Sequence, residues 1–302
     1  MTAMEVPTPL SPLALGSLPP LPELQLAAVG HVEMVSFVEV ERLPAAGEVI
    51  RARHAHDQAA GGGAVVAVQL AKLSGRPLPF FTALGRDPLG QLAAEQLTAL
   101  GLDLHVAWCD APTRRAITFI DGAGERTITV IGERLRPTAA DPLPWAQLES
   151  CDGVFATATD AAGLALARAA RVLAATPRLG LPVLRAAAVQ LDALIGSALD
   201  PAEAVAPHSL EQLPRLRIAT RGASGGEFEP GGLFLAPPRQ SPPIDTYGAG
   251  DSFAAGVTAA LAAGWSVAEA ISLGCHCGNA CLNGRGPYPG QIGRQAVGPQ
   301  GR

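Results

Sequence analysis

The stretch Asp245–Gly256, DTYGAGDSFAAG, places a carboxylate directly after a Gly-Ala-Gly turn and before an alanine-rich run. The run has the composition of a helix that ends at Gly264. A helix N-terminus attracts anions through its unpaired backbone N–H groups, here those of Gly248, Ala249 and Gly250. A phosphoryl group could bind there while Asp251 accepts a proton from an attacking hydroxyl. The alternative is that Asp251 is an ordinary N-cap residue, a position that aspartate favours.

The composition excludes several classes of protein. The chain has 302 residues, of which 48% are hydrophobic and 16% charged, as is typical of a globular protein with a large core. A net charge of -5 leaves no basic surplus for nucleic acid, and no apolar run is long enough to span a membrane. Lys72 is the only lysine, so the chain has neither a P-loop lysine nor the strand lysine of protein kinases. Phosphates would have to be held by backbone amides, arginine or metal.

Residues 1–22 are rich in proline and leucine and lack the charged start of a signal peptide, so we expect a flexible tail on a cytoplasmic protein. Five cysteines without a secretion signal argue against a disulfide framework. Cys275, Cys277 and Cys281 could bind a metal. They lie in a predicted helix, however, where residues i and i+2 face apart, and this favours buried thiols.

Strands and helices alternate along most of the chain. We expect buried strands at 24–30, 78–85, 152–157, 182–187 and 216–222, and helices at 61–75 and 88–101. This alternation favours an α/β fold of three layers, with a mostly parallel central sheet whose ligands bind at the carboxyl ends of the strands. Residues 115–132 have instead the pattern of a β-hairpin around Asp-Gly. We expect this hairpin to form a separate flap with residues 32–43.

The segment DTYGAGDSFAAG resembles the C-terminal signature of the PfkB, or ribokinase-like, family of carbohydrate kinases at every position that the signature specifies. Four more segments resemble the same family in the same order: VGHVEMVSFVEVERLPAAGEVIRA, GGGAVVAVQLAKLSG, TALGRDPLGQLAAEQLTALGLD and IATRGASGG. The resemblance implies a ribokinase-like three-layer α/β/α fold with a kinase domain at 23–292 and a tail at 293–302. A small β lid would be formed by about residues 31–56 and 112–132.

The resemblance further implies ATP-dependent phosphorylation of a hydroxyl group on a sugar-like small molecule. Asp251 would be the catalytic base, and Gly248, Ala249 and Gly250 would form the anion hole for the γ-phosphate. Mg²⁺ would be required, and a monovalent cation such as K⁺ would bind near Asp245. The residues that match nucleotide-binding positions are Thr220, Gly222, Gly225 and Asn279, although Asn279 could equally lie on a helix surface.

On the substrate side we expect Glu33, Gly62, Gly63 and Arg115. The family usually has an aspartate where this chain has Val35; Glu33 lies on the same face of the strand and could replace it, or it could face solvent. The asparagine that usually follows the glycines is a valine, Val65 or Val66. The pocket is therefore expected to be less polar than one for ribose or fructose, or polar in different places.

The family's Asn-x-x-Glu metal motif is matched imperfectly by Ser197 and Asp200, with Glu203 nearby. Asp200 could reach Mg²⁺ through water, or it could simply cap the next short helix. Five arginines lie near the lid and could bind an acidic or phosphorylated sugar, or could be solvated surface residues: Arg114, Arg115, Arg126, Arg134 and Arg136.

Other functions stay open at this stage. A nucleoside kinase of the same fold would use the less polar pocket for a base. A catalytically silent sugar or nucleotide sensor would explain the lost polar residues but not the complete DTYGAGD block. An oxidoreductase is disfavoured, because no predicted strand is followed by G-x-G-x-x-G. The exposed strand edges of a lid could also pair with a second copy and form a homodimer.

Overall fold

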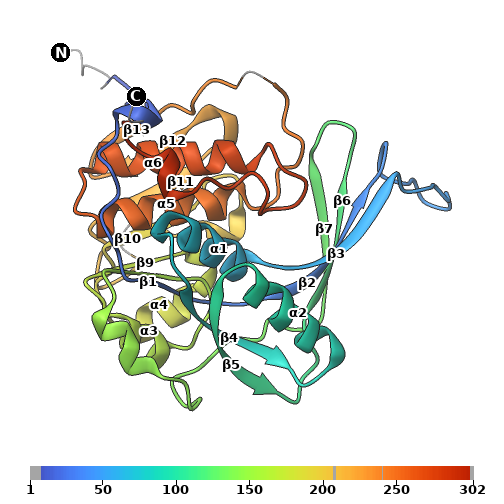
Figure 1. The fold of residues 1–302 in the computed structure, drawn as a ribbon, viewed down its shortest axis with the longest axis horizontal. Helices are drawn as coiled ribbons and strands as arrows, with labels where there is room; N and C mark the ends of the chain where they lie inside the picture. The colour runs from blue at the N-terminus through green and yellow to red at the C-terminus, as the bar shows by residue number, and fades with distance from the viewer. Residues whose placement is uncertain (1–7, 207–208, 240, 300–302) are drawn as a thin grey trace.

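A large sheet forms the centre of the molecule (Figure 1). In the computed structural model, which describes residues 8–206, 209–239 and 241–299, nine strands form this sheet in the order β13-β12-β11-β10-β9-β8-β1-β4-β5. The strands are parallel except for β12 and β13, which are antiparallel. The bounds are β1 (Leu26–Val29), β4 (Leu78–Gly85), β5 (Leu102–Cys109), β8 (Gly153–Ala156), β9 (Val172–Ala175), β10 (Ala193–Ser197), β11 (Arg217–Thr220), β12 (Gly226–Glu229) and β13 (Gly232–Phe234).

Helices cover both faces of this sheet. Their bounds are α1 (Gly62–Ser74), α2 (Pro88–Ala99), α3 (Ala161–Ala167), α4 (Leu181–Ala187), α5 (Ala249–Ala262) and α6 (Val267–Cys281). Leu26 and Ala28 of β1 belong to the core formed with α1, α5 and α6, whereas Ala27 and Val29 belong to the core formed with α3 and α4. Consecutive residues of β1 thus serve two cores, because side chains alternate along a strand. No helix among the described residues has the length and apolar character to cross a membrane.

A smaller sheet of four strands projects from one end of the body (Figure 1). Its order is β3-β2-β6-β7, with β2 and β6 parallel and the outer pairs antiparallel. The bounds are β2 (Glu33–Glu39), β3 (His54–Ala60), β6 (Arg115–Ile120) and β7 (Arg126–Ile131). This sheet corresponds to the predicted lid, and the central sheet with helices on both faces has the predicted three-layer α/β/α arrangement.

Several elements have the bounds that their local sequence predicted. Strand β4 spans Leu78–Gly85, and the hairpin at 115–132 contains β6 and β7. Helix α1 ends at Gly75, whose φ of 70° favours glycine. Helix α2 begins at Pro88. The preceding residue, Asp87, caps the helix by accepting a hydrogen bond from the Gly90 N–H at 2.7 Å.

The strand predicted at 182–187 is wrong, because these residues belong to helix α4. Pro182 lies in the first turn of that helix, where its missing N–H group is not needed. A short apolar run does not by itself distinguish a strand from a helix. The parallel strands of this region are β9 and β10, which lie on either side of α4 in the chain.

The N-terminal segment from residue 8 onward is folded onto the domain, contrary to the flexible tail predicted for 1–22. Leu18 and Leu21 are 1% and 3% exposed, and Leu10 forms a β-bridge with Phe234 of β13. The prolines prevent a helix, but they do not prevent leucines from packing on the core. The tail predicted at 293–302 is also in contact with the domain as far as Gly298, since Val297 is buried and the N–H of Gly298 donates a hydrogen bond to the carbonyl of Leu15 at 3.2 Å. Residues 1–7 and 300–302 lie outside the described residues.

Leu18→Ala should lower the free energy of unfolding by about 2–5 kcal/mol, because the substitution leaves a cavity in the core. Leu13→Ala is the matched control, since Leu13 lies in the same segment but is 42% exposed. Urea denaturation of both variants measures the difference. Equal and small effects would mean that the segment does not contribute to the core.

Candidate active site

Asp251 lies where the N-termini of α1 and α5 approach each other. Helix α5 begins after Gly248, whose φ of 80° lies in the left-handed region that favours glycine. A Cβ atom added to Gly62, the first residue of α1, would lie 2.9 Å from Oδ1 of Asp251. The hydroxyl of Tyr247 accepts a hydrogen bond from the N–H of Gly61 at 3.0 Å and links the two helix starts. The positive ends of two helix dipoles are therefore close to one carboxylate.

Asp251 is the third residue of α5, so its interpretation as an N-cap is wrong. Gly248 occupies the N-cap position, and within the described part of the chain no side chain caps this helix. The first-turn N–H groups, which include those of Ala249 and Gly250, are therefore available to an anion. A Cβ atom built on Gly250 would meet no atom within 4 Å, so there is room for a ligand beside this turn.

Burial raises the pKa of the Asp251 carboxyl group to about 6. The positive charge of Arg126 opposes this shift, the negative charge of Glu203 adds to it, and the charge of Arg178 opposes it. A carboxylate with a pKa in this range is unprotonated at neutral pH, yet basic enough to accept a proton from a hydroxyl group during a reaction.

A buried polar cluster borders Asp251 on the side of the lid. His31 and Glu33 are 6% and 7% exposed, and Nε2 of His31 lies 3.8 Å from Oε1 of Glu33. The same Glu33 oxygen lies 3.2 Å from Nε of Arg114. Glu33 therefore does not face solvent, and Arg114 compensates its charge. Burial, followed by the charge of Arg134, lowers the pKa of His31 well below its ordinary value, so the imidazole is neutral.

Four arginines surround a cavity of about 310 Å³ next to this cluster. The cavity is lined by Arg114, Arg134, Arg136, Ala158, Thr159, Arg178 and Leu179. These residues come from the two places where the lid joins the body and from the segments that follow β8 and β9. Arg115, expected on the substrate side, is exposed on β6 and does not line this cavity, because neighbouring residues of an extended chain face opposite sides.

The lid hairpin rests on the loop that leads into α5. The N–H of Thr246 donates a hydrogen bond to the carbonyl of Gly124 at 3.2 Å, and Arg126 donates to the carbonyl of Thr246 at 2.5 Å. Gly124 has a φ of 79°, and a Cβ atom there would lie 2.6 Å from the carbonyl oxygen of Pro243. Only glycine fits this turn, so the position of the lid on the loop that leads into α5 is fixed.

The residues predicted to bind the nucleotide lie at the carboxyl end of β11 and on α6. Thr220 is the last residue of β11, and its hydroxyl donates a hydrogen bond to the carbonyl of Gly196 at 3.3 Å. Gly222 and Gly225 form the following turn with φ of 56° and 83°. The side-chain oxygen of Asn279 accepts a hydrogen bond from Arg239 at 2.8 Å, so Asn279 is not simply a solvated helix-surface residue.

The two substrate-side glycines have different surroundings. Gly62 faces Asp251, whereas a Cβ atom at Gly63 would lie 2.5 Å from the carbonyl oxygen of His31. Gly63 thus permits the close packing of α1 against the segment after β1, and Gly62 keeps the space beside the carboxylate free.

The predicted magnesium residues are engaged in other contacts. Asp200 caps the short turn Pro201–Glu203 by accepting a hydrogen bond from the Ala202 N–H at 2.9 Å, and it pairs with Arg178. Glu203 also pairs with Arg178 and accepts a hydrogen bond from the N–H of Ser197 at 2.7 Å. Both offer the hard oxygen atoms that Mg²⁺ prefers. Among the described residues, however, no group of three or more His, Cys, Asp or Glu side chains could hold a metal, so the ion would also need nucleotide phosphates and water.

Asp245 connects the loop that leads into α5 to the segment after α6. One carboxylate oxygen accepts a hydrogen bond from the N–H of Tyr247 at 2.8 Å, and the other from the N–H of Gly286 at 2.9 Å. Its role toward a cation stays a prediction. The thiol of Cys281 lies in the same region, 3.4 Å from the carbonyl of Tyr247, and is buried with Cys275 and Cys277 on α6. These surroundings agree with buried thiols.

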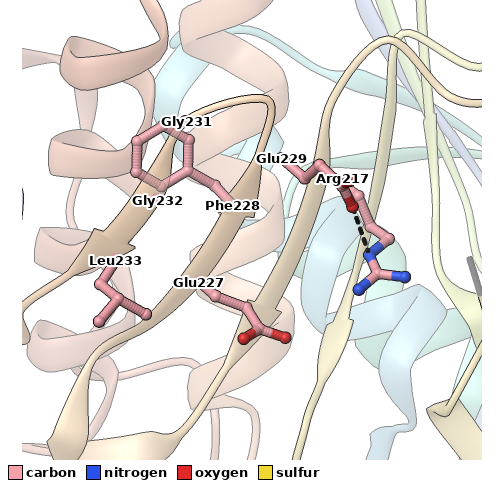
Figure 2. A pocket seen from close by; sticks show the side chains of 7 residues that line it. All are labelled: Arg217, Glu227, Phe228, Glu229, Gly231, Gly232 and Leu233. Atoms are coloured by element: carbon pink, nitrogen blue, oxygen red, sulfur yellow. Dashed lines mark ion pairs between the residues drawn. The ribbon is translucent and has the colours of Figure 1, made fainter. Parts of the chain in front are cut away.

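Another hollow, of about 390 Å³, lies at the edge of the main sheet (Figure 2). It is lined by Arg217, Glu227, Phe228, Glu229, Gly231, Gly232 and Leu233. Arg217, which pairs with Glu229 at 3.8 Å, is the first residue of β11, whereas the predicted nucleotide loop follows the last residue of that strand. The hollow is therefore not part of the site around Asp251.

The match to a protein family decides the class of this chain: residues 23–291 match the pfkB family carbohydrate kinase. The chain belongs to the pfkB family. A ribokinase from Arabidopsis thaliana is 26% identical to this kinase over 314 residues, which cover 90% of this chain and 79% of the relative.

Solved structures show the same fold. The Arabidopsis thaliana ribokinase complexed with ribose and ATP has a TM-score of 0.66 at 22% identity, over 91% of this chain and 98% of the other. A Methanocaldococcus jannaschii nucleoside kinase, an archaeal member of the ribokinase family, has a TM-score of 0.64 at 17% identity, over 89% and 95% of the two chains. The predictions of family, fold and enzyme class are confirmed.

Sequence reasoning missed two residues of the site, His31 and Arg178. His31 directly follows Gly30 at the end of the first strand, where it is a neutral side chain between Glu33 and Gly62. Arg178 comes after β9, and because the sequence analysis did not predict this strand, it did not place Arg178 at the carboxyl edge of the sheet. The signal that was overlooked is the short apolar run Val172–Ala175, which forms β9.

The base role predicted for Asp251 requires the unprotonated carboxylate, so with any acceptor that the kinase turns over, kcat/KM should fall as the pH drops through about 6. Arg126→Ala removes the charge that lowers this pKa most, so the acid limb of the pH profile should move to higher pH. Arg115→Ala removes an exposed charge from the neighbouring lid strand and should leave the limb in place. A limb that moves to lower pH in Arg126→Ala would contradict the assignment.

Proposed function

We propose that this kinase transfers the γ-phosphoryl group of ATP to a hydroxyl group of a sugar-like small molecule, with Asp251 as the general base. The observation that carries the proposal is the position of Asp251. Its carboxylate lies in the first turn of an uncapped helix, beside a glycine that leaves space for a ligand, and has a pKa of about 6. The family match and the plant relative complexed with ribose and ATP support the same reaction.

In the proposed reaction the acceptor hydroxyl oxygen forms a bond to the γ-phosphorus, and its proton passes to Asp251. The bond between the γ-phosphorus and the bridging oxygen breaks, and ADP leaves. The first-turn N–H groups at Gly248, Ala249 and Gly250 stabilise the negative charge on the phosphoryl oxygens. The lid lies over the loop before α5 and excludes water from the site.

The nucleotide would bind along Thr220, Gly222, Gly225 and Asn279. A magnesium ion, when bound, neutralises the charge of the transferring phosphates, and Asp200 and Glu203 would hold it through water. A monovalent cation such as K⁺ would bind at the loop that Asp245 shapes. Two alternatives use the same geometry, namely a nucleoside kinase and a silent sensor that binds its ligands without turnover.

An ADP-release assay with Mg-ATP and K⁺ should give turnover for at least one compound in a panel of sugars, sugar acids, sugar phosphates and nucleosides. Asp251→Asn should lower the rate on the order of 10²–10⁴-fold, because general-base catalysis is lost. Turnover of nucleosides alone would favour the nucleoside kinase. ATP binding without any turnover would favour the sensor and contradict the proposed reaction.

Asp251→Asn should also be more stable than the wild type at neutral pH. A variant that is more stable but inactive has lost the base and not the fold. The folded-state pKa of Asp251 is raised from 3.8 to about 6, so its contribution to stability is present below pH 3.8 and is lost as the pH rises through about 6. Asparagine resembles the protonated form. The variant should therefore gain up to roughly 3 kcal/mol near pH 8 and nothing near pH 3. Thermal melts at both pH values measure this, and a variant that is less stable near pH 8 would contradict it.

We further propose that the lid pairs with a second copy of the chain. Strand β7 is an edge strand of the lid, and Ile128, Val130 and Ile131 on it are 42%, 47% and 44% exposed. Exposed apolar edge strands favour pairing. Light scattering should show a dimer for the wild type and a monomer for Val130→Asp, with Leu199→Asp, which replaces an exposed leucine outside the lid, as the control. A wild-type monomer would refute the pairing.

A further inference from the structure

The cavity beside Asp251 carries uncompensated positive charge. Of its four arginines, Arg114 pairs with Glu33, and Arg178 pairs with Asp200 and Glu203. Arg134 and Arg136 have no carboxylate within ion-pair distance among residues 8–206, 209–239 and 241–299. The Arg134 guanidinium donates a hydrogen bond to the carbonyl oxygen of Arg178 at 3.1 Å, which leaves its charge uncompensated. None of the seven lining residues is acidic.

This excess charge acts on the groups around it. Burial lowers the pKa of the Arg134 guanidinium, and the neighbouring charge of Arg114 lowers it further. Burial, and after it the charges of Arg134, Arg114 and Arg178, lower the pKa of His31, so the imidazole stays neutral and adds no further positive charge. Like charges held this close cost free energy unless a ligand of opposite charge fills the space between them.

The cavity lies on the acceptor side of the base. It is formed where the lid joins the body and at the carboxyl ends of β8 and β9, whereas the predicted nucleotide loop follows β11, two strands beyond β9 in the sheet. The charge of Arg178 acts on Asp251, so the cavity and the base belong to one electrostatic site. An acceptor that spans both would place a hydroxyl group at Asp251 and its far end among the arginines.

The chemistry of the lining residues defines what this far end must be. A guanidinium group binds planar carboxylates and phosphates through paired hydrogen bonds and has no acceptor for a sugar hydroxyl proton. The nearby carboxylate, Glu33, has its charge compensated by Arg114 and does not line the cavity. The cavity is therefore suited to an anion and poorly suited to the hydroxyl groups of a neutral sugar.

We infer that the acceptor of this kinase carries an anionic group, a carboxylate or a phosphate, which binds in the cavity between Arg114, Arg134, Arg136 and Arg178. The inference rests on the proposed function, since it assigns the substrate class of the same site. It sets this chain apart from a kinase for neutral pentoses.

The test compares three compounds that share one carbon frame: D-ribose, D-ribonate and D-ribose 5-phosphate. Calorimetric titrations of the full chain without nucleotide should show at least about tenfold tighter binding of one charged compound than of D-ribose. The compound that binds more tightly distinguishes a carboxylate from a phosphate. If neither charged compound binds at millimolar concentration, or if D-ribose binds as tightly, the inference is overturned.

Arg136→Ala is the main variant, because Arg136 is exposed and its removal leaves no carboxylate unpaired among the described residues. It should weaken binding of the charged compound about tenfold, leave D-ribose unchanged, and be partly rescued by Arg136→Lys, which keeps the charge. Arg134→Ala should act in the same direction. Arg76→Ala, which removes an exposed arginine outside the cavity, is the control and should change nothing.

Binding of a non-hydrolysable ATP analogue to Arg136→Ala distinguishes the acceptor from the nucleotide. The affinity for the analogue should stay as in the wild type. An equal loss of affinity for the analogue and for the charged compound would assign the arginines to the nucleotide and overturn the inference.

Turnover with Mg-ATP separates the anionic acceptor from the proposed kinase reaction. D-ribose turnover with a KM unaffected by Arg136→Ala would leave the kinase reaction standing and refute the anionic acceptor. Tight binding of the charged compound without ADP release would refute the kinase reaction for that compound and leave the anion site standing.

Discussion

The close approach of Gly62 to Asp251 is the constraint on which the rest of the site depends. The Asp251 side chain in the first turn of α5 can lie beside the first residue of α1 only because that residue, Gly62, has no side chain. Gly61, with a φ of 88°, turns the chain into α1, and Gly248 does the same for α5. The Tyr247 hydroxyl, bonded to the Gly61 N–H, holds the two starts together. The carboxylate is therefore placed by the backbone geometry of the two helix starts and by the hydrogen bond that joins them.

The electrostatics of the site result from competition between burial and charge. Two helix N-termini and the charges of Arg126 and Arg178 all favour the ionised form of Asp251. Burial outweighs them, and the pKa rises to about 6. The same burial keeps His31 neutral in the midst of arginines. The site thus combines a carboxylate of moderate basicity with a surrounding field that is positive, which is what phosphoryl transfer requires.

The local sequence was sufficient to predict the elements whose structure depends on residues close together in the chain. The DTYGAGD block placed the start of α5 because glycine allows the left-handed turn at Gly248 from which the helix begins, and the Asp-Gly turn placed the hairpin of the lid. The local sequence did not predict the structure of segments that depend on packing against distant parts of the chain. Leu18 is buried by contacts with residues far along the chain, and residues 182–187 form a helix whose Leu184 packs into the same core as α3. The arginine cavity was missed in part for the same reason, since Arg114 and Arg178 are 64 positions apart by their numbers and meet only in the folded chain.

The contact between the lid and the loop that leads into α5 affects how this kinase can evolve. The hydrogen bond between Gly124 and Thr246 joins backbone atoms, so it does not depend on which side chains the neighbouring lid positions carry. Mutations in the lid strands can alter what the lid offers to a bound molecule without shifting its register on the loop. Gly124 and Arg126 are the exceptions, because any side chain at Gly124 would meet the carbonyl of Pro243, and the Arg126 side chain donates a hydrogen bond to the carbonyl of Thr246. The hairpin can therefore change its selectivity through most of its residues while Gly124 and Arg126 preserve its position on the loop.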